Sequence, residues 1–263
     1  MEKTHSNKVA IVTGSTKGIG FGIAQALSIS GANIIITSRT KSHAEETAAN
    51  INAYGGNAVG INFDITKQED LDHLVTETIK EFGQLDILVN NAVSQNCLIP
   101  SADFSDDKSI TTITENLTHT YLLSQKAYPH LKKQKGSILN ISSVITQRYL
   151  MGLPLYGIIK GALTQMTKVL AAEWACEGVR VNAINPGFIR TSAFKDMGLS
   201  DDLIKKSYHF YSQYQQLGGI GEPSKIGSAA AFLTSSEASF ITGSILDVDG
   251  GYSTRGQELY QPA

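Results

Sequence analysis

The sequence predicts one α/β domain over residues 1–263, built on a doubly wound parallel sheet with helices on both faces. Three observations support this prediction. Short, β-branched apolar runs alternate with longer stretches of helical periodicity. Glycines follow most of the helical stretches, where a helix end favours a left-handed residue. No linker rich in proline, glycine or serine and no repeat divides the chain.

The expected strands are apolar runs of the kind that a parallel sheet buries on both faces. Five are clear, at 9–13, 33–37, 86–90, 137–142 and 180–185, and two are weaker, at 57–61 and 244–248, which makes a sheet of about seven strands. Helical periodicity covers 18–30, 41–54, 67–82, 107–133, 155–177 and 222–234. The strand–helix alternation predicts right-handed crossovers throughout.

One segment, residues 188–221, breaks this rhythm because it is long, polar and rich in aromatic residues. An insertion of this kind between regular elements is typically a lid or a binding loop. A purely structural helical excursion is the alternative. We expect a substrate lid at residues 188–221.

Composition argues against several classes of function. A net charge of −2 and a pI near 6.3 give no electrostatic footprint for nucleic acid or an acidic membrane. Cys97, Cys176 and the scattered histidines show no metal-ligand spacing, so we expect reduced thiols and no metal. The polar N-terminus does not resemble a signal peptide, and no apolar run is long enough to span a bilayer. These features predict a cytoplasmic protein that acts on a small molecule.

A glycine-rich turn, TGSTKGIG (13–20), follows the first expected strand and precedes the first expected helix. In this context, typical of Rossmann-like folds, backbone N–H groups and the helix N-terminus face a phosphate. Glycine permits the close approach, because a Cβ atom would block it. The spacing is G-x-x-x-G-x-G rather than G-x-G-x-x-G, and the surrounding strand and helix are what favour a dinucleotide site.

The residues after the second strand predict which dinucleotide binds. An NAD-selective site places Asp or Glu about 20 residues after the glycine turn, to bind the ribose hydroxyls. Here the stretch TSRTK (37–41) carries Arg39 and no carboxylate, and Lys17 lies within the glycine turn. Two charge-assisted contacts of roughly 1.5–3 kcal/mol each to a 2′-phosphate would favour NADP(H) over NAD(H) about a hundredfold or more. The alternative is that both are ordinary surface charges.

Tyr156 and Lys160 stand at i and i+4, so on a helix they project from the same face. The ordinary interpretation is a core tyrosine beside a lysine whose ammonium reaches water. The other is a tyrosine acid whose proton affinity is tuned by a neighbouring cation. The pair alone does not decide between them.

The motifs taken together, in their order along the chain, resemble the short-chain dehydrogenase/reductase family from about residue 7 to residue 252. The likeness rests on TGSTKGIG, on VNNA (89–92), on Asp64 in FDITKQ, on Asn116 in ENLTHTYLL, on Ser143 placed 13 residues before Tyr156, on NPGFIRT (185–191) and on ITGSILDVDGGY (241–252). It implies a hydride-transfer enzyme, which favours the chemical interpretation of the Tyr–Lys pair.

The resemblance implies roles for four residues. Tyr156 would be the acid in reduction and the base in oxidation. Tyrosine ordinarily has a pKa near 10, too high for a base at neutral pH, and a cation such as Lys160 beside it favours the phenolate. Ser143 would donate to the substrate oxygen. Asn116 would hold a water that links Lys160 to solvent.

The resemblance also implies which residues bind the cofactor. We expect contacts from Gly14, Ser15, Thr16, Lys17, Gly18, Ile19, Gly20, Ser38, Arg39, Asp64, Ile65, Asn91, Ala92, Val93, Tyr156, Lys160, Pro186, Gly187, Ile189 and Thr191. The family's usual N-N-A-G is here NNAV, so Val93 adds a side chain near the expected ribose path.

The substrate wall is expected from Ser94, Gln95, Ser143, Ile145, Arg148, Tyr149 and Phe194. Aromatic rings with one arginine suit a ring-containing or anionic substrate. The alternative is that Arg148 points to solvent and the aromatic residues pack the lid.

Two rival functions remain. Overall the chain resembles 3-oxoacyl-[acyl-carrier-protein] reductases, whose docking positions tend to be basic. Here those positions are Gln134, which Lys132, Lys133 and Lys135 flank, and Glu177. Glu177 would repel an acidic carrier protein, so we expect a small carbonyl or alcohol substrate instead. The other rival is a catalytically idle NADP(H)-binding regulator, a class that commonly loses Tyr, Lys or Ser. The resemblance further implies a homotetramer or homodimer formed through the helices bearing Asn116 and Tyr156.

Overall fold

The computed structural model describes residues 3–94 and 105–255. Seven parallel strands form one sheet in the order β3-β2-β1-β4-β5-β6-β7. Their bounds are β1 Val9–Val12, β2 Asn33–Ser38, β3 Asn57–Asn62, β4 Ile87–Asn90, β5 Ser137–Ile141, β6 Arg180–Pro186 and β7 Ile245–Val248. The strand order reverses between β1 and β4, so a crevice is expected at the carboxyl ends of these two strands. The predicted doubly wound sheet is confirmed.

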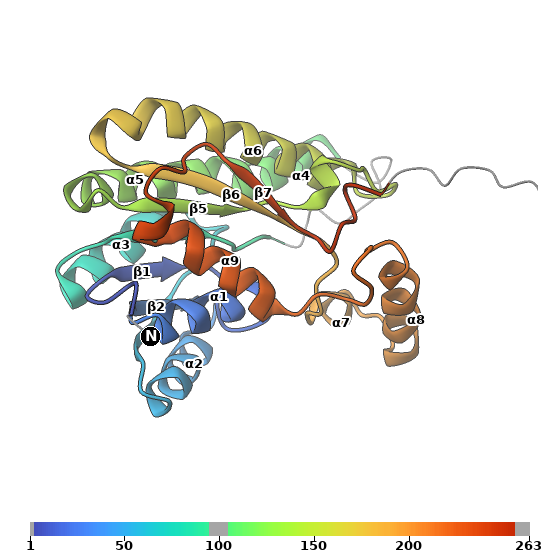
Figure 1. Cartoon of the computed structure of the whole chain (residues 1–263), viewed down its shortest axis with the longest axis horizontal. Coiled ribbons are helices and arrows are strands. Elements are labelled where there is room, and N and C mark those ends of the chain that lie inside the picture. Colours follow the sequence, from blue (N-terminus) through green and yellow to red (C-terminus); the bar gives the residue numbers. More distant parts are fainter. Residues whose placement is uncertain (1–2, 95–104, 256–263) are drawn as a thin grey trace, which may run out of the picture.

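Helices cover both faces of the sheet, as Figure 1 shows. Ile23, Leu27 and Ile226 belong to the core on the face covered by α1, α2 and α9. Leu71, Leu123 and Trp174 belong to the core on the face covered by α3, α5 and α6. The helix bounds are α1 Gly18–Ile29, α2 Lys41–Ala53, α3 Gln68–Phe82, α4 Asp106–Ile113, α5 His119–Gln134, α6 Pro154–Trp174, α7 Ala193–Asp196, α8 Asp201–Ser212 and α9 Pro223–Thr234.

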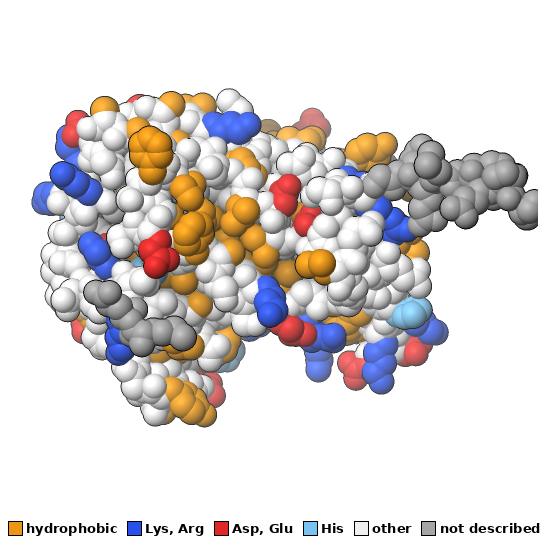
Figure 2. All heavy atoms as spheres, in the orientation of Figure 1, with side chains coloured by type: hydrophobic (Ala, Val, Ile, Leu, Met, Phe, Trp, Pro, Cys, Tyr) orange, Lys and Arg blue, Asp and Glu red, His pale blue; other side chains and the backbone are white. Residues whose placement is uncertain are grey.

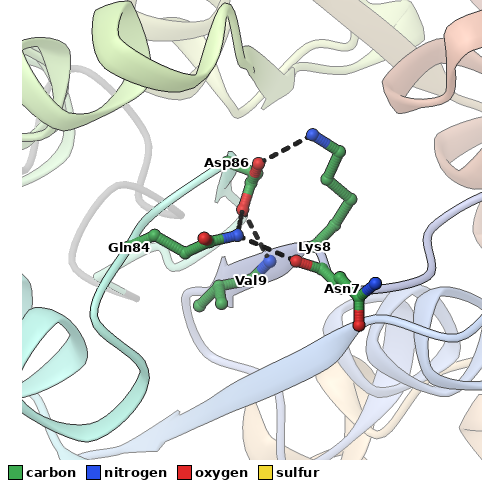
Figure 3. A network of polar contacts seen from close by, with 5 residues as sticks. All are labelled: Asn7, Lys8, Val9, Gln84 and Asp86. Atoms are coloured by element: carbon green, nitrogen blue, oxygen red, sulfur yellow. Dashed lines mark hydrogen bonds and ion pairs between the residues drawn. The ribbon is translucent and has the colours of Figure 1, made fainter.

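At the edge of the sheet where the strands begin, Asp86 connects β1 to β4; the sequence had placed this residue within a strand. The strand begins one residue later, and the buried Asp86 carboxylate accepts hydrogen bonds from Lys8 Nζ (2.9 Å), Val9 N (2.9 Å) and Gln84 Nε2 (2.7 Å) (Figure 3). Gln84 Nε2 also donates to Asn7 O (2.8 Å). These bonds fix the starts of β1 and β4 together, so the two strands end side by side at the opposite edge.

The expectation of one continuous helix over 107–133 is wrong. The chain forms α4, then a π-helical turn, η3 (Thr114–Thr118), and then α5. The side-chain amide of Asn116 donates to Thr112 O (2.9 Å), the carbonyl that in an α-helix accepts from the N–H of Asn116 itself. This competition opens the helix by one residue at Asn116, and π-turns of this kind occur frequently at functional sites.

The expected lid segment, 188–221, contains the short helix α7 and the longer helix α8. Both lie beyond the carboxyl ends of the strands, on the right in Figure 1. At the end of the Tyr156 helix, α6 gives way at Trp174 to a 3-10 turn, Ala175–Glu177. Within residues 3–94 and 105–255, no helix is long and apolar enough to cross a membrane and no cluster of His, Cys, Asp and Glu is placed to hold a metal.

Candidate active site

A cavity of about 980 Å³ runs along the carboxyl edge of the sheet. It extends from the end of β2, past the glycine turn, to Ser143 and Tyr156. Of the predicted cofactor-binding and substrate residues, those that line it are Gly14, Thr16, Lys17, Gly18, Ile19, Gly20, Ser38, Arg39, Asp64, Ile65, Asn91, Ala92, Val93, Ser94, Ser143, Ile145, Arg148, Tyr156, Gly187, Thr191 and Phe194.

The glycine turn has the backbone shape that a pyrophosphate requires. Gly14 and Gly18 have φ of 63° and 58°, in the left-handed region that favours glycine. A Cβ atom at Gly20 would collide with the carbonyl oxygen of Gly14 and the side chain of Asn91. Asn91 Nδ2 holds the turn by donating to Thr13 O (2.8 Å) and Gly14 O (3.1 Å). The start of α1 is therefore open to a phosphate, so these residues fit a dinucleotide.

Two threonines that the sequence did not single out fix this turn to the neighbouring strands. Thr13 Oγ1 accepts from the backbone N–H groups of Asn91 and Ala92, each at 2.9 Å. Thr37 Oγ1 accepts from Gly14 N (2.9 Å), and Ser15 Oγ accepts from Thr37 N (3.0 Å). Ser15, an expected cofactor contact, is fully buried and lies outside the cavity lining. The sequence signal that could have identified Thr13 and Thr37 is their place as polar residues at the end of an apolar strand.

The two cations expected near the 2′-phosphate differ in their surroundings. Arg39 is exposed at the cavity wall and forms no ion pair within the described residues. Lys17 Nζ lies 2.7 Å from Asp196 Oδ2 of α7, and Ser192 Oγ donates to the same oxygen (2.9 Å). The hydrogen bond from Lys17 lowers the pKa of Asp196, and the charge of Arg39 adds to the effect. Asp196 was not expected at the site.

The loop after β3 also lines the cavity. Asp64 Oδ1 accepts from Thr66 N (3.1 Å) and Thr66 Oγ1 (3.0 Å). Ile65 O accepts from Nδ1 of the buried His119 (2.6 Å), which links this loop to α5. Val93, the departure from the family pattern, is 44% exposed and lines the same cavity.

Helix α6 carries Tyr156 and Lys160 on one face, in its first two turns. Lys160 Nζ lies 5.6 Å from the centroid of the Tyr156 ring and donates to Ile141 O (2.7 Å) at the end of β5. Ser142 Oγ donates to Lys160 O (3.0 Å), which fixes the helix to the same strand. The lysine is only 7% exposed, so its charge lies in the interior beside the phenol. Ser143 follows β5 directly and lines the cavity with Tyr156.

Asn116 lies behind the cavity wall rather than in it. Its Oδ1 accepts from Ser94 N (2.7 Å), so the amide orients the backbone that follows β4. This arrangement assigns the side chain a positioning contact that the sequence did not predict. It does not test the expected water relay to Lys160.

A buried polar ladder, also not predicted, joins the strands and helices beneath the site. Asn90 Nδ2 donates to Ser124 Oγ (3.0 Å) and Asn140 Oδ1 (2.9 Å). Asn140 Nδ2 donates in turn to Thr167 Oγ1 (2.9 Å) on α6. Because a buried polar group is costly to leave unpaired, this ladder specifies how α5 and α6 sit on β4 and β5.

The turn after β6 is held by contacts with residues of the segment 188–221. A Cβ atom at Gly187 would lie 2.6 Å from Asp249 Cα, and Gln215 Oε1 accepts from Phe188 N (3.0 Å). Tyr208 OH donates to Thr191 O (2.9 Å) and accepts from Thr191 N (3.2 Å). Gly187 and Thr191 line the cavity, whereas Pro186 and Ile189 do not. Tyr208 and Gln215 thus position a segment that contains four of the expected cofactor contacts, Pro186, Gly187, Ile189 and Thr191.

Of the residues predicted to form the substrate wall, Ser94, Ile145, Arg148 and Phe194 line the cavity. Tyr149 does not: it is 87% exposed and lies outside the lining. Gln95 lies outside the described residues. Arg148 contributes to the wall instead of extending into solvent, and four aromatic rings line the same cavity, those of Phe188, Phe194, Tyr211 and Tyr252.

Comparisons with known proteins find relatives over nearly the whole chain. Residues 14–253 match the family described as enoyl-(acyl carrier protein) reductase. The L-fucose dehydrogenase of Oryctolagus cuniculus is 38% identical over 248 residues, covering 94% of this chain and 85% of the relative. The glucose 1-dehydrogenase 2 of Bacillus subtilis (strain 168) is 36% identical over 264 residues, covering 98% of this chain and 100% of the relative.

A similar solved structure is that of 7α-hydroxysteroid dehydrogenase complexed with NADH and 7-oxo glycochenodeoxycholic acid. It superposes with a TM-score of 0.86 at 30% identity and covers 95% of this chain and 96% of its own. Both the sequence matches and the structural match extend over nearly the whole chain. The chain therefore belongs to the short-chain dehydrogenase/reductase family of nicotinamide-dependent oxidoreductases, which act on alcohols and carbonyl compounds.

Proposed function

We propose that the protein transfers hydride between NADP(H) and the carbonyl or secondary alcohol of a small molecule, with Tyr156 as the acid and base. The observation that carries this proposal is the buried ammonium of Lys160, 5.6 Å from the Tyr156 ring, which itself lines the cavity beside Ser143.

The nicotinamide, when bound, gives or takes the hydride, and the protein must manage the proton on the substrate oxygen. Tyr156 OH donates that proton in reduction and accepts it in oxidation. The positive charge of Lys160 stabilises the phenolate left after donation. Ser143 Oγ donates a hydrogen bond to the same substrate oxygen and steadies its developing negative charge.

The preference for NADP(H) is supported by the cations at the far end of the cavity. Arg39 lines the wall and has no carboxylate partner among the described residues, so its guanidinium is available to a 2′-phosphate. Lys17 lines the same cavity, although its ammonium forms a salt bridge with Asp196. No acid occupies residues 37–41, where an NAD-selective site would place one.

The substrate proposed is a small molecule that contains a ring or carries an anionic group. The relatives named above are dehydrogenases of sugars, and the structural neighbour is complexed with a steroid acid. In this chain, Phe188, Phe194 and Tyr211 with Arg148 provide an apolar wall and one cation. A wall of this kind suits a ring better than a flexible polyol.

A 3-oxoacyl-[acyl-carrier-protein] reductase is the second candidate, and one contact favours it. Lys132 Nζ lies 2.9 Å from Glu177 Oε1, so the carboxylate expected to repel an acidic carrier is neutralised within the chain. Lys133 and Lys135 remain beside it. Comparing acetoacetyl thioesters with free ketones as substrates separates the two candidates. A catalytically idle NADP(H)-binding regulator would turn over neither.

We further propose a homotetramer or homodimer in the cytoplasm. Large apolar side chains are exposed on α6, at Ile158 and Val169, and near the last strand, at Phe232, Phe240 and Leu246. Figure 2 shows apolar side chains gathered over α9 and β7. A gathering of exposed apolar side chains on one face is typical of a surface that pairs with another copy.

The test of the proposal is Tyr156→Phe. This variant keeps the ring and loses the proton, so turnover with NADPH across a ketone panel should fall by at least ~100-fold while NADPH binding is unchanged. Tyr54→Phe is the matched control, because Tyr54 is 93% exposed and lies outside the cavity lining. If Tyr156→Phe kept full activity, the assignment of Tyr156 as the acid and base would be wrong.

A further inference from the structure

We propose that Arg148 binds a negatively charged group of the substrate, so that the enzyme selects ketones and alcohols in which a carboxylate is attached to an apolar ring framework. This inference rests on the proposed function, because it concerns the same cavity. It adds a specificity-determining residue at the end opposite Arg39.

The backbone holds Arg148 at a fixed place relative to Ser143. A 3-10 turn, η4 (Val144–Thr146), follows Ser143 directly. Arg148 N donates to Val144 O (3.0 Å), and Thr146 Oγ1 donates to Ser143 O (2.9 Å). Both the predicted oxygen-binding serine and the arginine therefore belong to one hydrogen-bonded turn, and the distance between them does not depend on a mobile segment.

The C-terminal part of the chain fixes the guanidinium itself. Arg148 Nη1 donates to Tyr252 O (3.1 Å), and the guanidinium carbon lies 5.4 Å from the centroid of the Tyr252 ring. This contact uses one nitrogen of a planar, forked cation, and Arg148 forms no ion pair with a carboxylate of the described residues. A fork of this kind pairs best with a carboxylate, through two parallel hydrogen bonds.

The surroundings of Arg148 strengthen an ion pair there. Apolar side chains form most of the wall around it: Ile145, Leu150, Leu153, Phe188, Phe194, Met197, Tyr211 and Tyr252. Apolar walls lower the effective dielectric and strengthen attraction between opposite charges. The described acids that line the cavity are Glu46, Asp64 and Asp196, all in the half that carries Arg39 or Lys17. Nothing described at the substrate end neutralises Arg148.

The cation and the apolar wall together indicate the chemistry of the substrate. Arg148 lies two residues beyond the 3-10 turn that follows Ser143, and apolar side chains line the cavity together with both residues. An apolar ring framework would fill this part of the cavity while its carboxylate pairs with Arg148, whereas a neutral polyol would offer the guanidinium no anionic partner.

The experiment compares 4-acetylbenzoate with its neutral counterpart 4-acetylbenzamide, using NADPH and the full-length wild-type protein. We expect kcat/KM to be at least tenfold higher for the acid. Arg148→Met should bring the ratio of the two values close to one, with the amide changed less than threefold, and Arg148→Lys should keep part of the preference. Arg190→Met is the charge-matched control, because Arg190 pairs with Glu222 (2.9 Å) and does not line the cavity.

Binding of the same two compounds to the enzyme–NADP⁺ complex, measured by calorimetry, gives a readout that does not need turnover. Tighter binding of the acid that Arg148→Met abolishes supports the proposal. Equal binding of acid and amide by the wild type overturns it, and so does a preference that survives Arg148→Met. If the wild type shows no preference for the acid but reduces other ketones with NADPH, only the role of Arg148 is wrong and the proposed function stands. If the wild type reduces no ketone of the panel, the proposed function itself is wrong.

Discussion

Lys17 Nζ lies 2.7 Å from Asp196 Oδ2, so a salt bridge joins the glycine turn to helix α7, although the two residues are far apart in the sequence. Ser192 Oγ donates to the same carboxylate (2.9 Å). The cation expected to bind a 2′-phosphate is therefore already paired, and a 2′-phosphate would have to compete with Asp196 for it. The Lys17 side chain is 60% exposed, so solvent strongly screens its attraction to either anion.

Asp196→Asn should strengthen the preference for NADPH, because it removes the carboxylate that holds Lys17 and repels a phosphate. Exposed pairs are worth up to about 1 kcal/mol, so the ratio of kcat/KM for NADPH over NADH should rise about two- to fivefold. Steady-state kinetics at low salt measures this ratio. Asp202→Asn is the control, since Asp202 pairs with Lys206 (2.7 Å) on α8, outside the cavity lining. A ratio that stays constant or falls contradicts the expectation.

Arg39→Ala should reduce the same ratio, because Arg39 lines the cavity near the glycine turn and has no ion-pair partner in the described chain. One charge-assisted contact of roughly 1.5–3 kcal/mol corresponds to a loss of about ten- to a hundredfold in kcat/KM for NADPH. The value for NADH should change less than threefold. Lys41→Ala serves as the control, because Lys41 Nζ faces Glu45 Oε1 (3.7 Å). Wild-type kcat/KM values that are equal for both cofactors would refute the preference itself.

The sheet and the glycine turn could be predicted because few other structures suit their residues. Runs such as 33–37 are too apolar to be exposed, and each strand appears within two residues of its expected bounds. Gly20 was also predictable, because only glycine fits there: a Cβ atom would collide with the backbone carbonyl of Gly14. Local pattern therefore determines the framework and the cofactor-facing turn.

The rest depends on contacts that no local pattern contains. The π-turn arises because the side chain of Asn116 takes the Thr112 carbonyl, a choice that periodicity does not show. The pair of Lys17 and Asp196 spans 179 residues, and Asn90 meets Asn140 across two strands. Such pairs are set by the tertiary fold, so the sequence alone does not show that their members contact each other.

We expect the protein to lose stability in mild acid because of the buried His5. It is buried, its Nε2 lies 3.0 Å from Thr234 Oγ1, and burial, with a smaller effect of Lys8, lowers its pKa to about 4. In the unfolded chain the ordinary pKa of 6.5 applies, so only the unfolded state gains a proton as the pH falls below that value. Stability from neutral His5 is complete above pH 6.5 and is lost as the pH falls towards 4.

The measurement is Tm against pH for the wild type and for His5→Gln, which keeps polar atoms and does not titrate. Tm of the wild type should fall more steeply than that of the variant between pH 6.5 and 4.5. His73→Gln is the control, because His73 is exposed on α3 and should leave the slope unchanged. Parallel slopes for wild type and His5→Gln would show that His5 does not titrate between the two states.

Asn116→Ala separates two roles for the asparagine of the π-turn. The structure gives its side chain a positioning contact, because Oδ1 accepts from Ser94 N (2.7 Å) next to the cavity, whereas the family resemblance implies a water relay to Lys160. Loss of the acceptor removes this hydrogen bond from the buried Ser94, at a cost of about 1–3 kcal/mol, and loosens the chain there. We expect KM for the ketone to rise about tenfold with an unchanged pH profile of kcat, if positioning is the main role.

The pH profile distinguishes the two outcomes, since only a group in the proton path alters how kcat depends on pH. Asn116→Asp is the second variant: it keeps an oxygen for Ser94 N but places a carboxylate against Thr112 O, where the amide now donates (2.9 Å). That variant should bind ketone better than Asn116→Ala and unfold at a lower temperature than the wild type. A shifted pH profile of kcat in Asn116→Ala, with KM unchanged, would instead place Asn116 in the proton path.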